Sequence, residues 1–179
     1  MMEMEGVRRN LVELKARVPD LEVIRNRLHG LGASYVGRFH QKDTYFEVPK
    51  GRLKLREVVG EEEARLIYYE RADTAGPRRS RVFIIRVQRT SPFIKRLLQI
   101  LKVRVVVEKV REIYRHEGTQ IHLDRVKGLG TFVEFEREVD STPQAVEEGR
   151  AILETLMRRL GIAPGDLEPL SYGDLLQPG

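Results

Sequence analysis

Residues 119–139 read TQIHLDRVKGLGTFVEFEREV, and apolar and charged side chains alternate along this stretch on both sides of a glycine turn. Before the turn, Ile121 and Leu123 alternate with His122 and Asp124. After it, the alternation is between the apolar Val133, Phe135 and Val139 and the acidic Glu134, Glu136 and Glu138. Successive side chains of a strand point to opposite faces, and strands joined by a short turn are antiparallel. The stretch therefore predicts a hairpin with one apolar face and one charged face.

Eight segments are rich in β-branched and aromatic residues and predict strands. Several of them alternate as the quoted stretch does: in the first, Leu14 and Ala16 share one face while Glu13 and Lys15 share the other. Eight antiparallel strands can close into a small barrel, which leaves no exposed edge. The predicted strands are residues 11–18, 43–48, 52–59, 65–73, 81–88, 105–115, 119–126 and 131–139.

Capping residues and the helical spacing of apolar side chains predict about three helices that flank the barrel. We therefore expect an α+β fold, a closed antiparallel eight-stranded β-barrel, in one domain over residues 1–179 with its core at about 9–176. The tail is expected to be ordered where Tyr172 can dock. The helices are predicted from Asp20 to Gly32, from Ser91-Pro92 to about Lys102, and from Thr142-Pro143 to Gly161.

The composition excludes several classes of protein. An apolar fraction of 41% suffices for a packed core, and the absence of cysteine excludes disulfides, thiolate zinc sites and a cysteine nucleophile. The first residues lack the apolar region of a signal peptide, and no apolar run is long enough to span a membrane, so we expect a cytoplasmic protein. The net charge of +5 fits an anionic partner without identifying it.

The charged strand faces have two interpretations. They could form the solvated face of an ordinary half-buried sheet, which is common. They could instead point into a closed barrel and form a charged tunnel, with the apolar faces turned outward against helices. Clustered Lys and Arg in a tunnel need a polyanion to relieve their repulsion, and carboxylates among them can hold Mg²⁺ or Mn²⁺, which bridge to phosphate oxygens. The second interpretation therefore implies a metal–polyphosphate complex.

Six segments of the chain together form a recognisable pattern: NLVELKARV (10–18), KDTYFEVPKGRLKLRE (42–57), YYERAD (68–73), VVVEKVREIY (105–114), IHLDRVKGLGTFVEFE (121–136) and SYGDLL (171–176). In this order they resemble the CYTH family, the triphosphate tunnel metalloenzymes, and most of all its class IV adenylyl cyclase branch. The resemblance covers about Arg9 to Leu176. It implies a closed eight-stranded barrel, lined by acidic and basic residues, that binds a triphosphate.

The resemblance assigns roles to individual residues. It implies that Glu13, Glu134 and Glu136 bind the metal, Mg²⁺ or Mn²⁺, and that Asp124 is a tunnel carboxylate. For a cyclase, we expect Lys15 or Asp124 to assist catalysis by orienting the pentose or accepting a proton. One position departs from the family pattern: its opening Glu-x-Glu-x-Lys has Leu11 at the first glutamate. We therefore expect one strongly held metal ion. The residues expected to bind the triphosphate are Arg52, Lys54, Arg56, Arg71, Arg86, Lys109 and Arg111.

Three functions remain open at this stage. The first is an adenylyl cyclase that converts ATP to cyclic AMP and pyrophosphate. The second is a tripolyphosphatase or thiamine triphosphatase that hydrolyses the terminal phosphate; Leu11 disfavours it, because a water-positioning carboxylate is missing. The third is a degenerate module that binds polyphosphate or nucleotide without turnover.

Some features have ordinary structural explanations. Residues 73–80 predict an exposed loop, and the basic cluster at 78–81 predicts a mobile loop that could act as a lid. The four histidines lack metal-ligand spacing, although His122 shares a strand face with Asp124. Nucleic acid is a disfavoured partner, because no strand has the interleaved aromatic residues of RNA-binding proteins. The apolar stripe of the last helix could support a homodimer.

Overall fold

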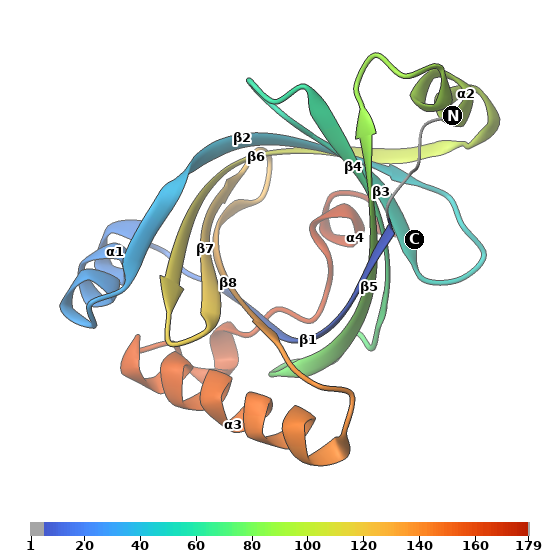
Figure 1. Ribbon diagram of the computed structural model, residues 1–179. Helices are drawn as coiled ribbons and strands as arrows, with labels where there is room; N and C mark the ends of the chain where they lie inside the picture. The colour runs from blue at the N-terminus through green and yellow to red at the C-terminus, as the bar shows by residue number, and fades with distance from the viewer. Residues whose placement is uncertain (1–5, 179) are drawn as a thin grey trace.

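The computed structural model describes residues 6–178, whose strands form a closed barrel with helices on its outside (Figure 1). The expectation about a signal peptide concerns residues outside this range. The elements are β1 (Gly6–Arg17), α1 (Leu21–Gly30), β2 (Ser34–Phe46), β3 (Arg52–Val58), β4 (Glu63–Arg71), β5 (Arg78–Gln88), α2 (Pro92–Ile100), β6 (Val103–His116), β7 (Thr119–Val126), β8 (Gly130–Glu138), α3 (Pro143–Arg159), a 3₁₀ turn (Pro164–Asp166) and α4 (Tyr172–Leu176).

The strand order around the barrel is β1-β5-β4-β3-β2-β6-β7-β8, and every neighbouring pair is antiparallel. The pairing of β1 with β8 closes the ring, which confirms the predicted eight-stranded barrel. The three predicted helices are also confirmed as α1, α2 and α3. Their capping side chains, Asp20, Ser91 and Thr142, each accept a hydrogen bond from a backbone N–H of the first turn. The short helix α4 comes in addition.

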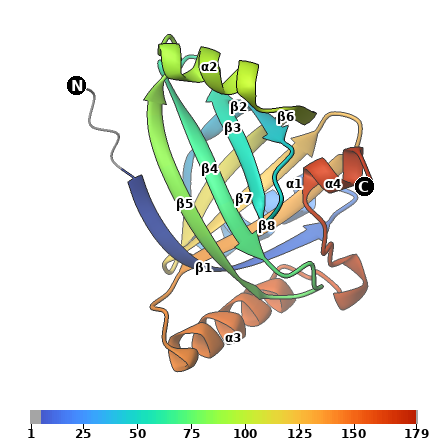
Figure 2. The ribbon, with the colours of Figure 1, turned by 90° about the vertical axis from the view of Figure 1, so that its right-hand side faces the viewer.

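The apolar strand faces point outward and are covered by helices. Val12, Leu14 and Ala16 of β1 lie in one core cluster with Leu28 of α1 and Leu153 of α3. Figure 2 shows α3 running along the lower side of the barrel and α2 lying on its upper side. Because the outer faces are apolar, the alternate charged side chains must point inward.

Helix α2 seals the outer face of the opposite strands. Its Ile94 is buried with Phe46 of β2, Leu55 of β3 and Leu66 of β4. Apolar surface is buried on the outside of the barrel beneath α1 and α3 and, on the opposite wall, beneath α2. This burial stabilises the barrel by about 25 cal/mol per Å² of apolar surface removed from water. The barrel therefore takes its hydrophobic stability mainly from outside the ring, which leaves the interior free for charged groups.

Strand β2 begins nine positions earlier than predicted, at Ser34 instead of Asp43. Its first half is polar and carries little strand pattern of its own. Pairing with β6 holds this half in place, from Ser34 opposite Arg115 onward, with a bulge between Tyr35 and Gly37. The extra length of β2 therefore depends on its pairing with β6, which the local sequence does not reveal.

The loop predicted over residues 73–80 is wrong in its second half, because β5 already begins at Arg78. Arg78 is 3% exposed and donates hydrogen bonds to the carbonyls of Thr74 and Pro169, at 2.8 Å and 2.6 Å. Ser80 is fully buried. The cluster at 78–81 is therefore part of the barrel wall and is no mobile lid.

The segment after α3 returns to the barrel and docks at one end of it. Leu167 forms a bridge with Ala16 of β1, and Lys15 donates a hydrogen bond to the carbonyl of Leu170 at 3.0 Å. Tyr172 of α4 is buried with Phe132, and Figure 2 shows α4 at one end of the barrel. The predicted docking of Tyr172 is thus confirmed. None of the helices over residues 6–178 has the length and apolar character needed to cross a membrane.

Candidate functional site

Charged side chains from five strands, β1, β3, β4, β6 and β8, line a cavity inside the barrel, among them most of the residues that the sequence nominated. The solvated-sheet interpretation is therefore wrong. Basic side chains outnumber carboxylates in this lining, which gives the tunnel a positive excess. The basic residues are Arg9, Lys15, Lys54, Arg56, Arg71, Lys109 and Arg111, and the acidic ones are Glu13, Glu134 and Glu136.

Three of the cations meet at Asp43, a fully buried carboxylate of β2 that the sequence did not single out. Arg56 donates two hydrogen bonds to it, both at 2.8 Å, and the Nζ atoms of Lys109 and Lys54 lie 2.9 Å and 3.2 Å from Oδ2. Burial alone would raise the pKa of Asp43, but Arg56, Lys109 and Lys54 hold it well below its ordinary value. One carboxylate thus fixes three cations and cannot neutralise all of them.

Burial also acts on the cations themselves. It lowers the pKa of Lys109 to about 7, against the opposing attraction of Asp43. It lowers the pKa of Lys15 to about 8, with Glu134 opposing. Both amines lie close to their titration point near neutral pH, and an added anion would favour their charged form.

Asp124, nominated as a catalytic carboxylate, is committed to other contacts. It is fully buried and accepts two hydrogen bonds from Arg111, at 2.7 Å and 2.6 Å, and one from the Tyr172 hydroxyl at 2.6 Å. Burial raises its pKa, but the Arg111 guanidinium lowers it below the ordinary value on balance. The carboxylate therefore positions Arg111 and α4.

The acidic side of the tunnel lies on β1 and β8, where Glu13 stands opposite Glu136 and Lys15 opposite Glu134 in the strand register. Glu13 forms ion pairs with Arg71 and, at 3.5 Å, with Arg78. Glu134 lies 3.4 Å from Arg111 and 3.8 Å from Lys15.

Glu136 differs from its acidic neighbours, because no residue in the described range 6–178 forms an ion pair or hydrogen bond with its carboxylate. Burial, together with repulsion from Glu134 and Glu13, raises its pKa to about 7. A carboxylate without a cation inside a positive tunnel is suited to a metal ion.

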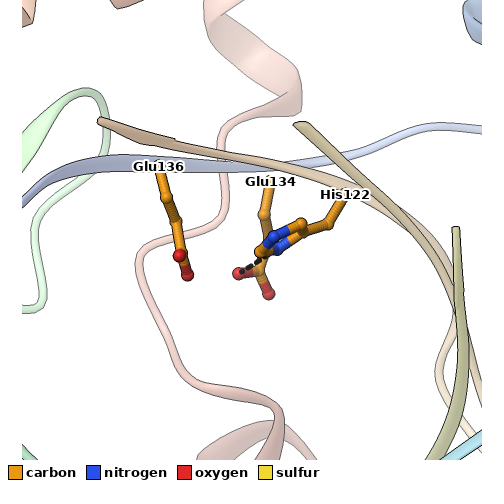
Figure 3. Close-up of side chains that lie close together, drawn as sticks. All are labelled: His122, Glu134 and Glu136. Atoms are coloured by element: carbon orange, nitrogen blue, oxygen red, sulfur yellow. Dashed lines mark ion pairs between the residues drawn. The ribbon is translucent and has the colours of Figure 1, made fainter. Parts of the chain in front are cut away.

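His122 joins Glu134 and Glu136 in a group whose ligand atoms all lie within 4.8 Å of one another. Figure 3 shows the imidazole and the two carboxylates side by side on the inner wall of the barrel. These donors fit a divalent cation, because Glu136 and the His122 Nδ1 atom have no hydrogen-bond partner among the described residues. The predicted third ligand, Glu13, is instead engaged by two arginines. The sequence signal for His122 was its shared strand face with Asp124.

Two nominated cations lie away from the tunnel centre. Arg52 forms ion pairs at 2.7 Å with Asp73 and with Asp174 of α4, and Arg86 is exposed without an ion-pair partner among residues 6–178. Arg52 and Arg71 line a hollow of about 530 Å³ beside α4, together with Arg79, Arg81 and Arg104. Arg71 also lines the tunnel, so the two spaces meet at that side chain.

The sequence profile of the CYTH domain matches residues 10–172 of this chain. The chain belongs to the CYTH family. This confirms the resemblance seen in the six sequence segments. CYTH proteins are generally metal-dependent enzymes that bind nucleoside triphosphates or polyphosphates, and the charged tunnel of this member agrees with that property.

Individual proteins and solved structures match nearly the whole chain. The PH1012 protein of Pyrococcus horikoshii OT3 is 32% identical, and its structure superposes with a TM-score of 0.80 over 92% of this chain and 98% of that one. A protein of Methanocaldococcus jannaschii named "Putative adenylate cyclase MJ0240" is 24% identical over 181 residues, 92% of this chain and 97% of its own. HpAC1 of Hippeastrum is 16% identical with a TM-score of 0.61, over 94% and 93% of the two chains, and shares the fold.

Proposed function

We propose that this CYTH protein is a metal-dependent adenylyl cyclase that converts ATP to cyclic AMP and pyrophosphate. The separation of charge inside the barrel carries the proposal. Cations from β3 and β6 surround Asp43, whereas Glu134 and Glu136 stand on β8 beside His122. A triphosphate bridging the two sides would neutralise the cations and share the metal with the carboxylates.

The cationic side supplies most of the binding energy for the triphosphate. Lys54, Arg56 and Lys109 present charge-assisted donors that Asp43 leaves partly unneutralised. A divalent cation at His122 and Glu136, when bound, supplies Lewis-acid stabilisation of the charge that develops on the leaving pyrophosphate. Positioning and electrostatics carry most of the catalysis of phosphoryl transfer, so the protein needs no covalent nucleophile.

Cyclisation requires that the ribose 3′-hydroxyl lose a proton as it attacks the α-phosphorus. Lys15 suits this role better than Asp124, because burial lowers the Lys15 pKa to about 8 and a fraction of the amine is neutral near that pH. Asp124 is held by Arg111 and Tyr172. We assign Lys15 as proton acceptor and Asp124 as a positioning residue.

The hollow beside α4 favours an organic triphosphate over inorganic tripolyphosphate. Its volume of about 530 Å³ lies in the usual range of small-molecule sites, roughly 300–1,000 Å³. Because Arg71 lines both spaces, a nucleoside in the hollow could keep its phosphates in the tunnel. Guanidinium groups such as that of Arg104 can stack on a nucleobase.

Hydrolysis of the terminal phosphate is the second candidate. HpAC1, which shares the fold, has a dominant triphosphatase activity. Hydrolysis of a terminal phosphate requires only the cations and carboxylates of the tunnel, and it needs no separate site for a nucleoside. Leu11 disfavours hydrolysis here, because it lines the tunnel where a water-orienting carboxylate would stand.

The deciding experiment incubates the protein with Mg²⁺ or Mn²⁺ and either ATP or tripolyphosphate, and identifies the products. Cyclic AMP with pyrophosphate supports the proposal, and orthophosphate from tripolyphosphate supports hydrolysis. Stoichiometric binding without any product would contradict both cyclisation and hydrolysis, and it would support a module that binds the triphosphate without turnover.

Two variants connect the product to the tunnel. Glu134→Gln should lower turnover at least about 100-fold, because it removes a carboxylate placed for metal binding. The matched control is Glu147→Gln on the exposed face of α3, which should keep full activity. Unchanged turnover in Glu134→Gln would show that the reaction does not use this site.

A further inference from the structure

The imidazole of His122 is buried at 2% exposure and lies between Gln120 and Glu134 on the tunnel wall. Its Nε2 atom is 2.6 Å from the Gln120 side-chain oxygen. An amide oxygen only accepts hydrogen bonds, so Nε2 carries the hydrogen and Nδ1 keeps its lone pair. Gln120 therefore fixes the tautomer in which Nδ1 is a potential metal ligand.

The Nδ1 atom faces the acidic group without bonding to it. It lies 4.0 Å from Glu134 Oε2, beyond hydrogen-bond distance, and has no hydrogen-bond partner within the described chain (Figure 3). The buried ring therefore presents at Nδ1 the free lone pair that a metal-ligating imidazole requires.

The separations suit an ion between the three side chains. Their ligand atoms lie within 4.8 Å of one another, and a small divalent ion sits roughly 2.0–2.2 Å from each ligand. A single ion can therefore reach all three donors after small side-chain rotations. The partner that Gln120 gives to the other ring nitrogen is the arrangement typical of ligating histidines.

We propose that His122 Nδ1 is a nitrogen ligand of the tunnel's metal ion beside Glu134 and Glu136, that Gln120 positions it, and that this ligand favours Mn²⁺ over Mg²⁺. The inference rests on the proposed function in taking the tunnel to hold a divalent ion. The preference follows from ligand chemistry. Mg²⁺ prefers oxygen donors and sheds water reluctantly, whereas Mn²⁺ is a first-row transition-metal ion and accepts an imidazole nitrogen more readily than Mg²⁺ does.

Pulsed electron paramagnetic resonance of the Mn²⁺-loaded full chain tests the ligand directly. Coordination by His122 predicts a ¹⁴N coupling to Mn²⁺, which changes to a ¹⁵N coupling when only the histidines are labelled with ¹⁵N. The measurement needs no substitution, so it does not depend on whether a variant folds. Bound Mn²⁺ without histidine coupling would overturn the inference and leave the proposed function intact. Failure of wild-type protein to bind Mn²⁺ at all would overturn both.

Variants give a second readout by calorimetric titration of Mn²⁺ and of Mg²⁺. His122→Gln should weaken Mn²⁺ binding about 10- to 100-fold and change Mg²⁺ binding much less. Gln120→Met, which loses the acceptor for Nε2–H, should weaken Mn²⁺ binding in the same direction. His29→Gln, on the exposed side of α1, is the control and should bind both ions as wild type does. Equal losses for Mn²⁺ and Mg²⁺ in His122→Gln would contradict the selectivity.

Discussion

Tyr172 donates its hydroxyl hydrogen to Asp124 Oδ2 at 2.6 Å and thereby joins α4 to β7 inside the barrel. The ammonium of Lys15 lies 3.9 Å from the centre of the same ring, and Phe132 contacts the ring edge-on. One side chain thus connects the C-terminal helix with a nominated catalytic residue on β1. The tunnel wall and the docked tail are therefore parts of one structure.

The first prediction concerns this contact. Tyr172→Phe should destabilise the protein by about 1.5–3 kcal/mol, because it removes a hydrogen bond to a buried carboxylate. Chemical denaturation measures the loss, and limited proteolysis should show earlier cleavage near the C-terminal helix. Tyr35→Phe, at an exposed ring, is the control. Wild-type stability in Tyr172→Phe would show that the contact contributes nothing.

The second prediction concerns Asp43 and its three cations. Asp43→Asn should cost about 3–5 kcal/mol of stability, because it leaves Arg56, Lys109 and Lys54 unpaired in the barrel. Tripolyphosphate should restore more stability to this variant than to wild type, since it supplies the missing negative charge. Thermal unfolding with and without tripolyphosphate tests this.

The control for the second prediction is Asp140→Asn on the exposed end of the barrel, which should behave as wild type. Equal stabilisation of wild type and Asp43→Asn by tripolyphosphate would contradict binding of the anion at this cluster.

The third prediction is a pH dependence. Burial lowers the pKa of Lys109 to about 7, so raising the pH from 6 to 8 removes its charge in the free protein. Metal-free binding of tripolyphosphate should therefore weaken over this range and take up a proton near pH 7. Calorimetry at several pH values measures both effects. Lys109→Arg should reduce the dependence of tripolyphosphate affinity on pH, because arginine stays charged. An unchanged dependence would show that another group takes up the proton.

The fourth prediction uses Leu11. Leu11→Glu places a carboxylate among buried tunnel residues, so it should destabilise the metal-free protein by about 1–3 kcal/mol. Mn²⁺ should recover part of this loss, and orthophosphate release from tripolyphosphate should rise. Leu11→Gln has nearly the same shape without the charge and should show no recovery by Mn²⁺. Identical responses of the two variants would show that the added carboxylate does not reach a metal.

The alternation along β1, β7 and β8 was enough to predict strands with one charged face, because strand parity is a local property. The number of predicted strands, eight, allowed a closed barrel without requiring one. Whether that face points inward is decided by closure of the ring, and the resemblance to the CYTH family supplied this information. The barrel, its three main helices and the family are confirmed. The metal and triphosphate roles of the nominated side chains stay predictions.

The features that the sequence missed depend on contacts between distant segments. Asp43 meets Lys109 only because β2 pairs with β6, 66 positions away. Arg78 meets Glu13 only because β1 pairs with β5, which lies far away in the sequence. No local pattern contains these two pairings. His122 and Glu134 do face each other within the predicted hairpin, but the sequence does not show that the His122 Nδ1 atom lies without a hydrogen-bond partner.

The surplus of cations around Asp43 has a practical consequence for biochemistry on this protein. A cavity that holds several partly neutralised ammonium and guanidinium groups will retain small oxyanions from its surroundings. Phosphate or sulfate from a purification buffer would then co-purify with the protein and inhibit it. Activity measured after exchange into a chloride buffer free of oxyanions should therefore exceed activity measured in phosphate.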